Sequence, residues 1–313
     1  LTLLNLSHVS AQQITPTPAP TKTPQDTKAA TQTTEPPITR DQPFTQADLS
    51  VITANTQRPN GIVWHDNYLY TVCSGDWTIY KIDADTGATG QYIYGVRNAH
   101  TLYATESNND LQLWIPDFQT DTLVRIQRGI VENITTGLNG PWGITALEDN
   151  NFIVTNLKGN NAVKITSEGK QEIIISNLRS PTGVATDQTH IYIANTGSAR
   201  RAIEWFSIEQ INEEDTDLPL SADAVGQPLV SGLQNTTGLV IASDGMLYFS
   251  YALGTRGVVG RVDPEQCINN GGCSNDQVEI ILYTELAVPL AGLTISPDMR
   301  LYIHSMFSPD LYW

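Results

Sequence analysis

One unit recurs six times after residue 58 of this 313-residue chain: a glycine or its substitute, a short apolar run, a tight turn and a second apolar run. The six copies begin at Gly61, Thr101, Gly143, Gly183, Gly238 and Gly292. Apolar runs of strand length that recur at a regular spacing indicate small sheets repeated around a ring. The sequence therefore predicts an all-β fold, a six-bladed β-propeller.

The way the ring closes is also visible in the repeat. Each copy is expected to form four strands, but the sixth ends in its third strand, at residues 311–313. Alignment of RPNG at 58–61 with SPTG at 180–183 places residues 51–54 over residues 173–176 without a gap. Because residues 173–176 are a predicted outer strand, we expect an N-terminal strand to complete the last blade and remove an exposed sheet edge.

The residues before the repeats predict an exported, tethered protein. The chain opens LTLLNLSHVSAQQ, with Val9 and Ala11 spaced like a signal-peptidase site, so residues 1–11 are predicted to be a signal-peptide remnant. An ordinary fragment end is the alternative. Residues 12–43 are rich in Thr, Pro, Gln and Ala, which predicts a disordered linker. The propeller is assigned to residues 44–313, and the protein to a secreted, cell-surface or periplasmic location.

The net charge and hydropathy of the chain limit the classes of partner that it is expected to bind. The chain has 17 Lys+Arg against 33 Asp+Glu, a formal net charge of -16, which disfavours nucleic acid as a partner. No apolar run approaches the roughly twenty residues of a transmembrane helix. An acidic insert at residues 209–226 is expected to be a solvated loop on the face opposite the ligand-binding mouth of the channel, with a calcium or partner site as the alternative.

The three cysteines divide into a pair and a single residue. Cys267 and Cys273 flank the short loop CINNGGC, and in an exported protein their closeness predicts a disulfide. The reactivity of Cys73 is left open, because the pKa of a thiol depends on its neighbours in space.

Three of the copies resemble known propeller families. The third, GPWGITALEDNNFIVTNLKGNNAVKIT, and the fourth, SPTGVATDQTHIYIANTGSARRAIEW, resemble NHL repeats. The first, RPNGIVWHDNYLYTVCSGDWTIYKIDADTG, looks like the regucalcin and gluconolactonase family, which is also six-bladed. This resemblance implies a divalent metal at the channel mouth and a metal-dependent lactonase or hydrolase activity.

That family builds its metal site largely from the positions just before the blade glycines. Here those positions hold Asn60, His100, Trp142, Thr182, Thr237 and Ala291. Asn60 matches the family's PNG ligand, whereas the family's Glu and Asp ligands have no counterpart. A hard cation needs anionic oxygens, so we predict no cofactor, with calcium at Asn60 as the alternative. Asn60 is otherwise a turn residue before glycine.

A second set of mouth positions follows the second strand of each blade: Cys73, Asp117, Asn156, Asn195, Tyr251 and Ser305. His100 is expected near Asp117, and such a pair would suit general acid–base catalysis, because the carboxylate orients the imidazole and raises its pKa. The alternative is a hydrogen-bonded structural histidine. We find neither the late His and Glu cluster of virginiamycin-type lyases nor the mouth glutamate of strictosidine-synthase-like propellers.

The basic residues are unevenly distributed. Half of those beyond Arg40 map to mouth loops: Arg58, Arg97, Lys158, Arg179, Arg200, Arg201 and Arg256. Aromatic residues are interleaved with them: Trp77, Phe118, Trp142, Tyr251 and Phe307. Aromatic rings stack on sugars and arginines hold anions.

We therefore predict that the mouth binds a partner protein, or a glycan or other anionic ligand. The predicted contact residues are Asn60, Trp142, Asn156, Asn195, Arg200, Arg201, Tyr251 and Arg256. A metal-dependent lactonase or hydrolase using His100 and Asp117 is one alternative. A purely structural scaffold is the other, because a propeller fold by itself does not specify a function.

Overall fold

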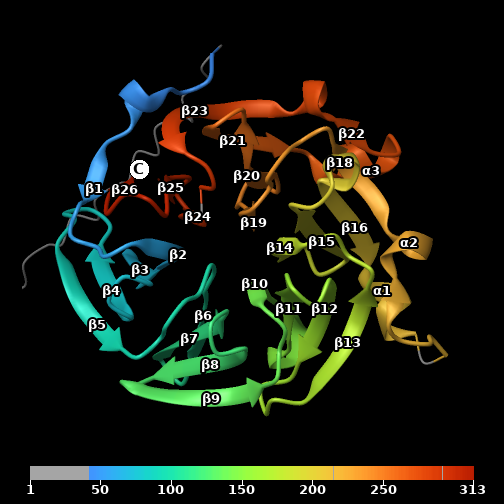
Figure 1. The fold of residues 1–313 in the computed structure, drawn as a ribbon, viewed down its shortest axis with the longest axis horizontal. Helices are drawn as coiled ribbons and strands as arrows, with labels where there is room; N and C mark the ends of the chain where they lie inside the picture. The colour runs from blue at the N-terminus through green and yellow to red at the C-terminus, as the bar shows by residue number, and fades with distance from the viewer. Residues whose placement is uncertain (1–41, 214, 291) are drawn as a thin grey trace, which may run out of the picture. The chain divides into compact units, whose positions relative to one another are not determined.

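A computed structural model describes residues 42–213, 215–290 and 292–313. Six small sheets follow one another around a ring, so the predicted six-bladed β-propeller is confirmed (Figure 1). The predicted signal-peptide remnant at residues 1–11, and all but the last two residues of the predicted linker at 12–43, lie outside the described residues. Among the helices of the described part, none is long and apolar enough to span a membrane.

The strands of each blade run in order from the centre of the ring to its rim (Figure 1). Blade 1 comprises β2 (Pro59–His65), β3 (Tyr68–Cys73), β4 (Thr78–Asp83) and β5 (Thr89–Tyr94). Blade 2 comprises β6 (Tyr103–Ser107), β7 (Asp110–Asp117), β8 (Thr122–Gln127) and β9 (Ile130–Thr136). Blade 3 comprises β10 (Pro141–Ala146), β11 (Phe152–Asn156), β12 (Asn161–Ile165), β13 (Gln171–Ser176) and β17 (Leu220–Ser221).

The other three blades repeat this arrangement. Blade 4 comprises β14 (Pro181–Thr186), β15 (His190–Asn195), β16 (Ile203–Ser207), β18 (Gln227–Ser231) and β22 (Cys273–Ser274). Blade 5 comprises β19 (Leu239–Ile241), β20 (Leu247–Leu253), β21 (Arg256–Val262) and β23 (Glu279–Ala287). Blade 6 comprises β24 (Gly292–Ile295), β25 (Leu301–His304), β26 (Leu311–Tyr312) and β1 (Val51–Thr53).

The two ends of the propeller close the ring, as predicted. The N-terminal strand β1 is the outer strand of blade 6 and pairs with β26, with Val51 opposite Tyr312. Ser50 and Trp313 exchange two backbone hydrogen bonds of 3.0 Å. Thr56 adds a hydrogen bond from its hydroxyl to the carbonyl of Pro309, at 2.6 Å. The last blade therefore needs residues from both ends of the chain.

Three consecutive blades have a covered outer edge. The short strand β17 pairs in parallel with β13 of blade 3, and β22 pairs in parallel with β18 of blade 4. Phe44 forms a parallel bridge to Leu282 in β23 of blade 5. Each covering segment precedes the outer strand of the next blade, so one arrangement occurs three times and protects edges that would otherwise be free to pair.

The α-helices of the described residues lie on the perimeter of the ring, on the side of blades 3 and 4 (Figure 1). They are α1 (Ile208–Asn212), α2 (Ala222–Val225) and α3 (Pro264–Asn269). The predicted disulfide is present, and it joins Cys267 in α3 to Cys273 in β22. It therefore fixes the loop that covers the edge of blade 4.

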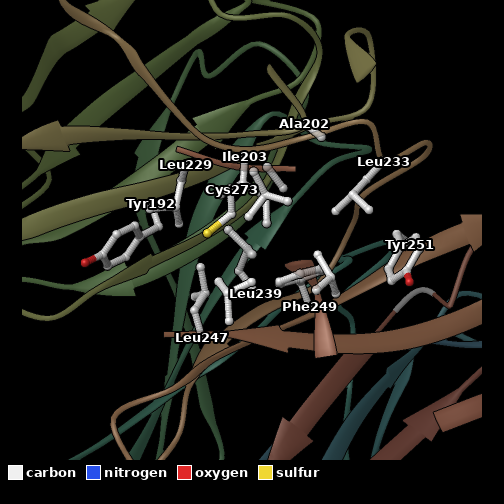
Figure 2. Packing of buried hydrophobic residues seen from close by; sticks show 14 of the residues in the cluster. Tyr192, Ala202, Ile203, Leu229, Leu233, Leu239, Leu247, Phe249, Tyr251 and Cys273 are labelled. Carbon is white, nitrogen blue, oxygen red and sulfur yellow. The ribbon is translucent and has the colours of Figure 1, made fainter. Parts of the chain in front are cut away.

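Neighbouring blades are held together by apolar side chains. Figure 2 shows the cluster between blades 4 and 5, where Ile203 and Leu229 face Leu239 and Phe249. All four are buried. Large apolar side chains removed from water stabilise each such seam.

The recurring glycine allows consecutive inner strands to approach closely. A Cβ atom at Gly143 would lie 2.3 Å from the carbonyl oxygen of Thr182, and one at Gly183 would lie 2.4 Å from the carbonyl oxygen of Thr237. Real Cβ atoms essentially never come so near an oxygen. The glycine that marks each repeat in the sequence is thus required at these two positions by the contact with the next blade.

Candidate functional site

The mouth of the channel is the face that carries the loops from the second to the third strand of each blade and from one blade to the next. On this face the ring of His100 stacks on Trp142, with centroids 3.5 Å apart and planes 4° apart. Phe118 packs edge-on against both rings, at 5.2 Å and 5.9 Å. We call His100, Phe118 and Trp142 the stacked cluster. Lys158 places its Nζ atom 4.3 Å from the centre of the Phe118 ring.

Burial determines the charge of His100. Desolvation lowers the pKa of His100 to about 3, because a buried imidazole is less easily protonated. The ring is therefore neutral at physiological pH. Its Nδ1 atom is buried and has no hydrogen-bond partner among the described residues.

Asp117 is buried next to Phe118 of the stacked cluster, but its carboxylate binds backbone N–H groups. Its carboxylate accepts hydrogen bonds from the backbone N–H groups of Arg97 at 2.8 Å, Gln119 at 2.9 Å and Thr120 at 3.2 Å. No hydrogen bond within the described part of the chain joins it to His100. The carboxylate that was predicted to orient the imidazole instead holds the loop that enters blade 2.

Asn156 and Asn195 occupy the same position in the next two blades and make the same kind of contact. The side-chain oxygen of Asn156 accepts the N–H of Asn139 at 3.2 Å, and that of Asn195 accepts the N–H of Arg179 at 2.9 Å. These oxygens each bind the loop leading into their own blade, so their hydrogen bonds stabilise the fold. Asp and Asn are favoured in turns because their short side chains reach backbone N–H groups.

The side-chain amide of Asn60 is hydrogen-bonded through only one of its two polar atoms within the described residues. Its Nδ2 donates to Oδ1 of Asn98 at 2.5 Å, while its own Oδ1 is buried and has no partner in the described residues. The indole Nε1 of Trp142 is likewise buried without a described partner. Asn60, His100 and Trp142 thus each present a polar atom that the described protein groups leave unbonded.

Cys73 and Tyr251 are both buried at the mouth. Burial raises the pKa of the Cys73 thiol to about 12, so the thiolate needed of a nucleophile is scarce at neutral pH. Burial also raises the pKa of Tyr251 to about 12. Tyr251 lines a hollow of about 290 Å³ together with Leu233, Leu253 and Tyr283, among others. This hollow lies between blades 4 and 5, away from the stacked cluster.

Two of the three arginines predicted to contact ligand are paired with carboxylates. Arg201 donates to Oε1 of Glu204 at 2.6 Å and to the carbonyl of Ala222 at 2.8 Å. Arg256 approaches Oε2 of Glu285 at 3.2 Å. Arg200 is outside every described ion pair. Of the three arginines predicted to contact ligand, it alone is without a carboxylate partner among the described residues.

The carboxylate of Glu204 was not singled out from the sequence. It is fully buried, and its Oε2 accepts from Nδ2 of Asn195 at 2.7 Å. Burial raises the pKa of Glu204, although Arg201 acts in the opposite direction. The available signal was a lone glutamate in an otherwise apolar strand, three residues after an arginine.

The acidic insert reaches the mouth side, contrary to expectation. Its strand β17 follows the outer edge of blade 3, and Asp223 in α2 pairs with Arg179 in the loop that enters blade 4. Ala222 accepts from Arg201, in another mouth loop. The prediction that this insert lies on the opposite face is therefore wrong for its second half.

The donor atoms do not suit a divalent cation. No group of three or more His, Cys, Asp or Glu side chains in the described ranges is arranged to hold a metal. Asn60 offers one neutral oxygen, the oxygens of Asp117 are bonded to backbone N–H groups, and His100 is stacked on an indole. Calcium needs several oxygen ligands with negative charge among them, so the metal implied by the regucalcin resemblance does not fit these residues.

Comparisons with known proteins agree on the fold. No protein-family model matches the sequence, and no curated protein matches it significantly. A gluconolactonase structure from Xanthomonas campestris is 15% identical over 84% of this chain and 87% of that one, with a TM-score of 0.61. A calcium-binding regucalcin from Agrobacterium tumefaciens is 13% identical over 86% and 93%, with a TM-score of 0.59.

A third similar structure is a catalytically inactive virginiamycin B lyase from Staphylococcus aureus, solved with quinupristin. It is 18% identical over 82% of this chain and 81% of that one, with a TM-score of 0.52. At these identities the likeness shows a shared six-bladed propeller fold. The resemblance to regucalcin- and gluconolactonase-like propellers is thus confirmed for the fold, and the NHL-repeat assignment stays a prediction.

Proposed function

We propose that this chain is a binding protein whose channel mouth, over blades 1 to 3, binds a glycan or an anionic ligand. The observation that carries the proposal is the set of buried, unbonded polar atoms on Asn60, His100 and Trp142. Buried polar groups in folded proteins are normally hydrogen-bonded. Three adjacent exceptions at one mouth support a site in which a hydroxyl-rich molecule supplies the missing partners.

The chemistry of the three atoms suits a carbohydrate. The indole Nε1 of Trp142 can only donate a hydrogen bond, Oδ1 of Asn60 can only accept one, and Nδ1 of the neutral His100 can do either, depending on its tautomer. A sugar hydroxyl both donates and accepts. Lys158 lies over Phe118 at the edge of the stacked cluster and forms no described ion pair, so it can neutralise an acidic group on the ligand.

The test is a glycan array with the full chain, followed by titration calorimetry on the best ligand. Replacing Trp142→Ala removes both a hydrogen-bond donor and a stacking face, and should weaken binding about tenfold or more. Lys158→Met should weaken binding of acidic ligands, whereas its matched control Lys164→Met, on strand β12, should not. Unchanged affinity in Trp142→Ala and Lys158→Met would refute this site.

The lactonase alternative rests on the similar structures, and those show the fold alone. The donor atoms at the mouth do not support the metal that such an activity implies. Turnover of a lactone that disappears on chelation would overturn the binding proposal in favour of an enzyme. Absence of binding to every array ligand would favour the scaffold alternative.

We also propose that the protein is exported. The Cys267–Cys273 disulfide supports this, because disulfides persist in oxidising compartments and are rare in the cytosol. Mass spectrometry of the protein from its native source, before and after reduction, would test whether this disulfide forms there. A fully reduced pair in freshly isolated protein would contradict export.

A further inference from the structure

A second group of aromatic and basic side chains lies on the rim of blade 1. The turn between β3 and β4 carries Trp77, which is 38% exposed. The guanidinium carbon of Arg97, in the loop from blade 1 to blade 2, is 5.3 Å from the centre of the indole. Tyr94, at the end of β5, lies 6.3 Å from Trp77 with its plane tilted by 38°. We call Trp77, Tyr94 and Arg97 the rim clamp.

Trp77 has a backbone conformation that a bulky residue rarely adopts. Its φ angle is 60°, in the left-handed region. The same position, four residues after the end of the second strand, holds Asp121 in blade 2 and Asn160 in blade 3, with φ angles of 55° and 51°. Asp and Asn tolerate this region because their short side chains hydrogen-bond nearby backbone groups.

The two smaller residues also do something that tryptophan cannot. Asp121 accepts the N–H of Gly140 at 2.8 Å, and Asn160 accepts the N–H of Ser180 at 2.8 Å, so each ties its turn to the next blade. Among the described residues, blade 1 has no such side-chain contact and has an exposed indole instead. A local departure from backbone preference is expected where function outweighs stability.

No carboxylate in the described part of the chain neutralises the positive charge of the rim clamp. Arg97 is outside every ion pair formed by the described residues, although the chain carries a net charge of -16. The nearest carboxylate in sequence to Trp77 is Asp76, whose oxygens accept from the N–H of Thr78 and the hydroxyl of Tyr80, at 3.2 Å and 2.6 Å. Arg97 therefore keeps its guanidinium free for an anion while it covers the indole.

The rim clamp is connected to the mouth. The backbone N–H of Arg97 is bonded to Asp117, and the next residue of blade 2, Phe118, belongs to the stacked cluster. The N–H of Phe118 donates to the carbonyl of Asn98, at 2.7 Å. These two bonds join the loop that carries Arg97 to the turn that carries Phe118, so we expect an extended ligand seated at the mouth to reach the rim clamp.

We propose that the rim clamp binds a uronic acid residue of an oligosaccharide, with the sugar ring against Trp77 and its carboxylate on Arg97. The exposed part of the indole, which Arg97 does not cover, offers apolar surface to the C–H groups of a pyranose ring. A guanidinium binds a carboxylate through two parallel hydrogen bonds. This inference rests on the proposed function in taking the ligand to be a glycan, and it assigns the acidic sugar to blade 1.

The test compares tetragalacturonate with maltotetraose, a neutral sugar of equal length, by titration calorimetry on the full chain. The wild type should bind the acidic sugar about tenfold more tightly. Trp77→Asn introduces the residue that blade 3 has at this position, so it should fold, keep or raise the melting temperature, and lose the preference for the acid. Arg97→Met should lose the same preference.

Trp313→Ala is the matched control. Trp313 is also an exposed indole beneath an arginine, but that arginine, Arg300, is paired with Asp85 and Asp298. This variant should keep the wild-type preference. A Trp77→Asn protein that still prefers the acid, or one that loses thermal stability with no change in affinity, would show that Trp77 is structural and overturn the proposal.

The variant Trp142→Ala separates this inference from the proposed function. Equal weakening of both sugars in Trp142→Ala, with the preference intact in Trp77→Asn, would support the mouth and reject the rim clamp. Wild-type affinities in Trp142→Ala, with the preference lost in Trp77→Asn, would support the rim clamp and reject the mouth. A wild type that binds neither sugar would overturn the rim clamp outright.

Discussion

The imidazole of His100 lies flat on the indole of Trp142, with ring centres 3.5 Å apart. His100 lies in the loop before β6 of blade 2, and Trp142 lies in β10 of blade 3. Each has a buried polar atom that the described protein groups leave unbonded. The stack occupies mouth positions from which regucalcin-like propellers would draw metal ligands. The mouth of this chain is therefore aromatic and neutral in the place where a metal site was implied.

Two buried histidines predict how stability depends on pH. Burial lowers the pKa of His100 to about 3 and that of His304 to about 4, against an ordinary value of 6.5. The unfolded chain therefore takes up protons first as the pH falls below 6.5, and the free energy of unfolding decreases until the folded pKa is reached. Between pH 7 and pH 5, each histidine should lower the free energy of unfolding by about 2 kcal/mol.

Urea unfolding at the two pH values would measure this loss. His304→Gln should remove about half of the pH dependence, whatever its effect on stability at pH 7. Equal dependence in His304→Gln and the wild type would mean that His304 is not the buried neutral group inferred here.

The repeat glycine gives a second prediction. Gly143→Ala forces a methyl group to within 2.3 Å of the carbonyl oxygen of Thr182, so it should lower the free energy of unfolding by about 3 kcal/mol. Gly90→Ala is the control, because nothing lies within 4 Å of its added Cβ. Chemical unfolding of both variants would test this, and similar stability in the two would contradict a close approach of blades 3 and 4.

The contrast between fold and site shows what the sequence can predict. The blades were predictable because a glycine and two apolar runs are local and recur, and the closing strand was predictable by aligning residues 51–54 with a repeat. The hydrogen-bond partners were not, because they come from distant parts of the chain. In sequence, Asp117 looks like the acid–base partner of His100 and Asn195 looks like a ligand contact, yet each accepts a hydrogen bond from a backbone N–H group in a loop 16 to 20 residues upstream.

Ring closure gives a third prediction. Deleting residues 44–57 removes β1 and the bridge from Phe44 to blade 5, so the domain should fail to fold. Deleting residues 1–43 removes neither. Thermal melts of the two truncated proteins beside the full chain would measure the difference, and equal melting temperatures would show that the N-terminal strand does not close the ring.

Chelation gives a fourth prediction. Since a ligand that binds only the native state raises the melting temperature, a bound calcium ion would appear as a shift on chelation. The donor atoms around Asn60 do not suit such an ion, so we expect the same melting temperature with added calcium and with EDTA. A shift of several degrees, absent in Asn60→Ala, would place a calcium ion at the mouth and revive the lactonase alternative.

The buried pair of Glu204 and Arg201 gives the last prediction. Arg201→Met would leave the fully buried carboxylate without its nearest counter-charge, which should cost about 3–5 kcal/mol of unfolding free energy. Glu204→Gln in the same chain should recover much of this loss, because a neutral amide needs no counter-charge. Arg200→Met is the control, since Arg200 is in no described ion pair, and it should be close to neutral. Urea unfolding of the wild type, Arg201→Met, Glu204→Gln and the variant with both changes forms a double-mutant cycle. Additive effects would mean that Arg201 does not stabilise Glu204 and is free to meet a ligand at the rim.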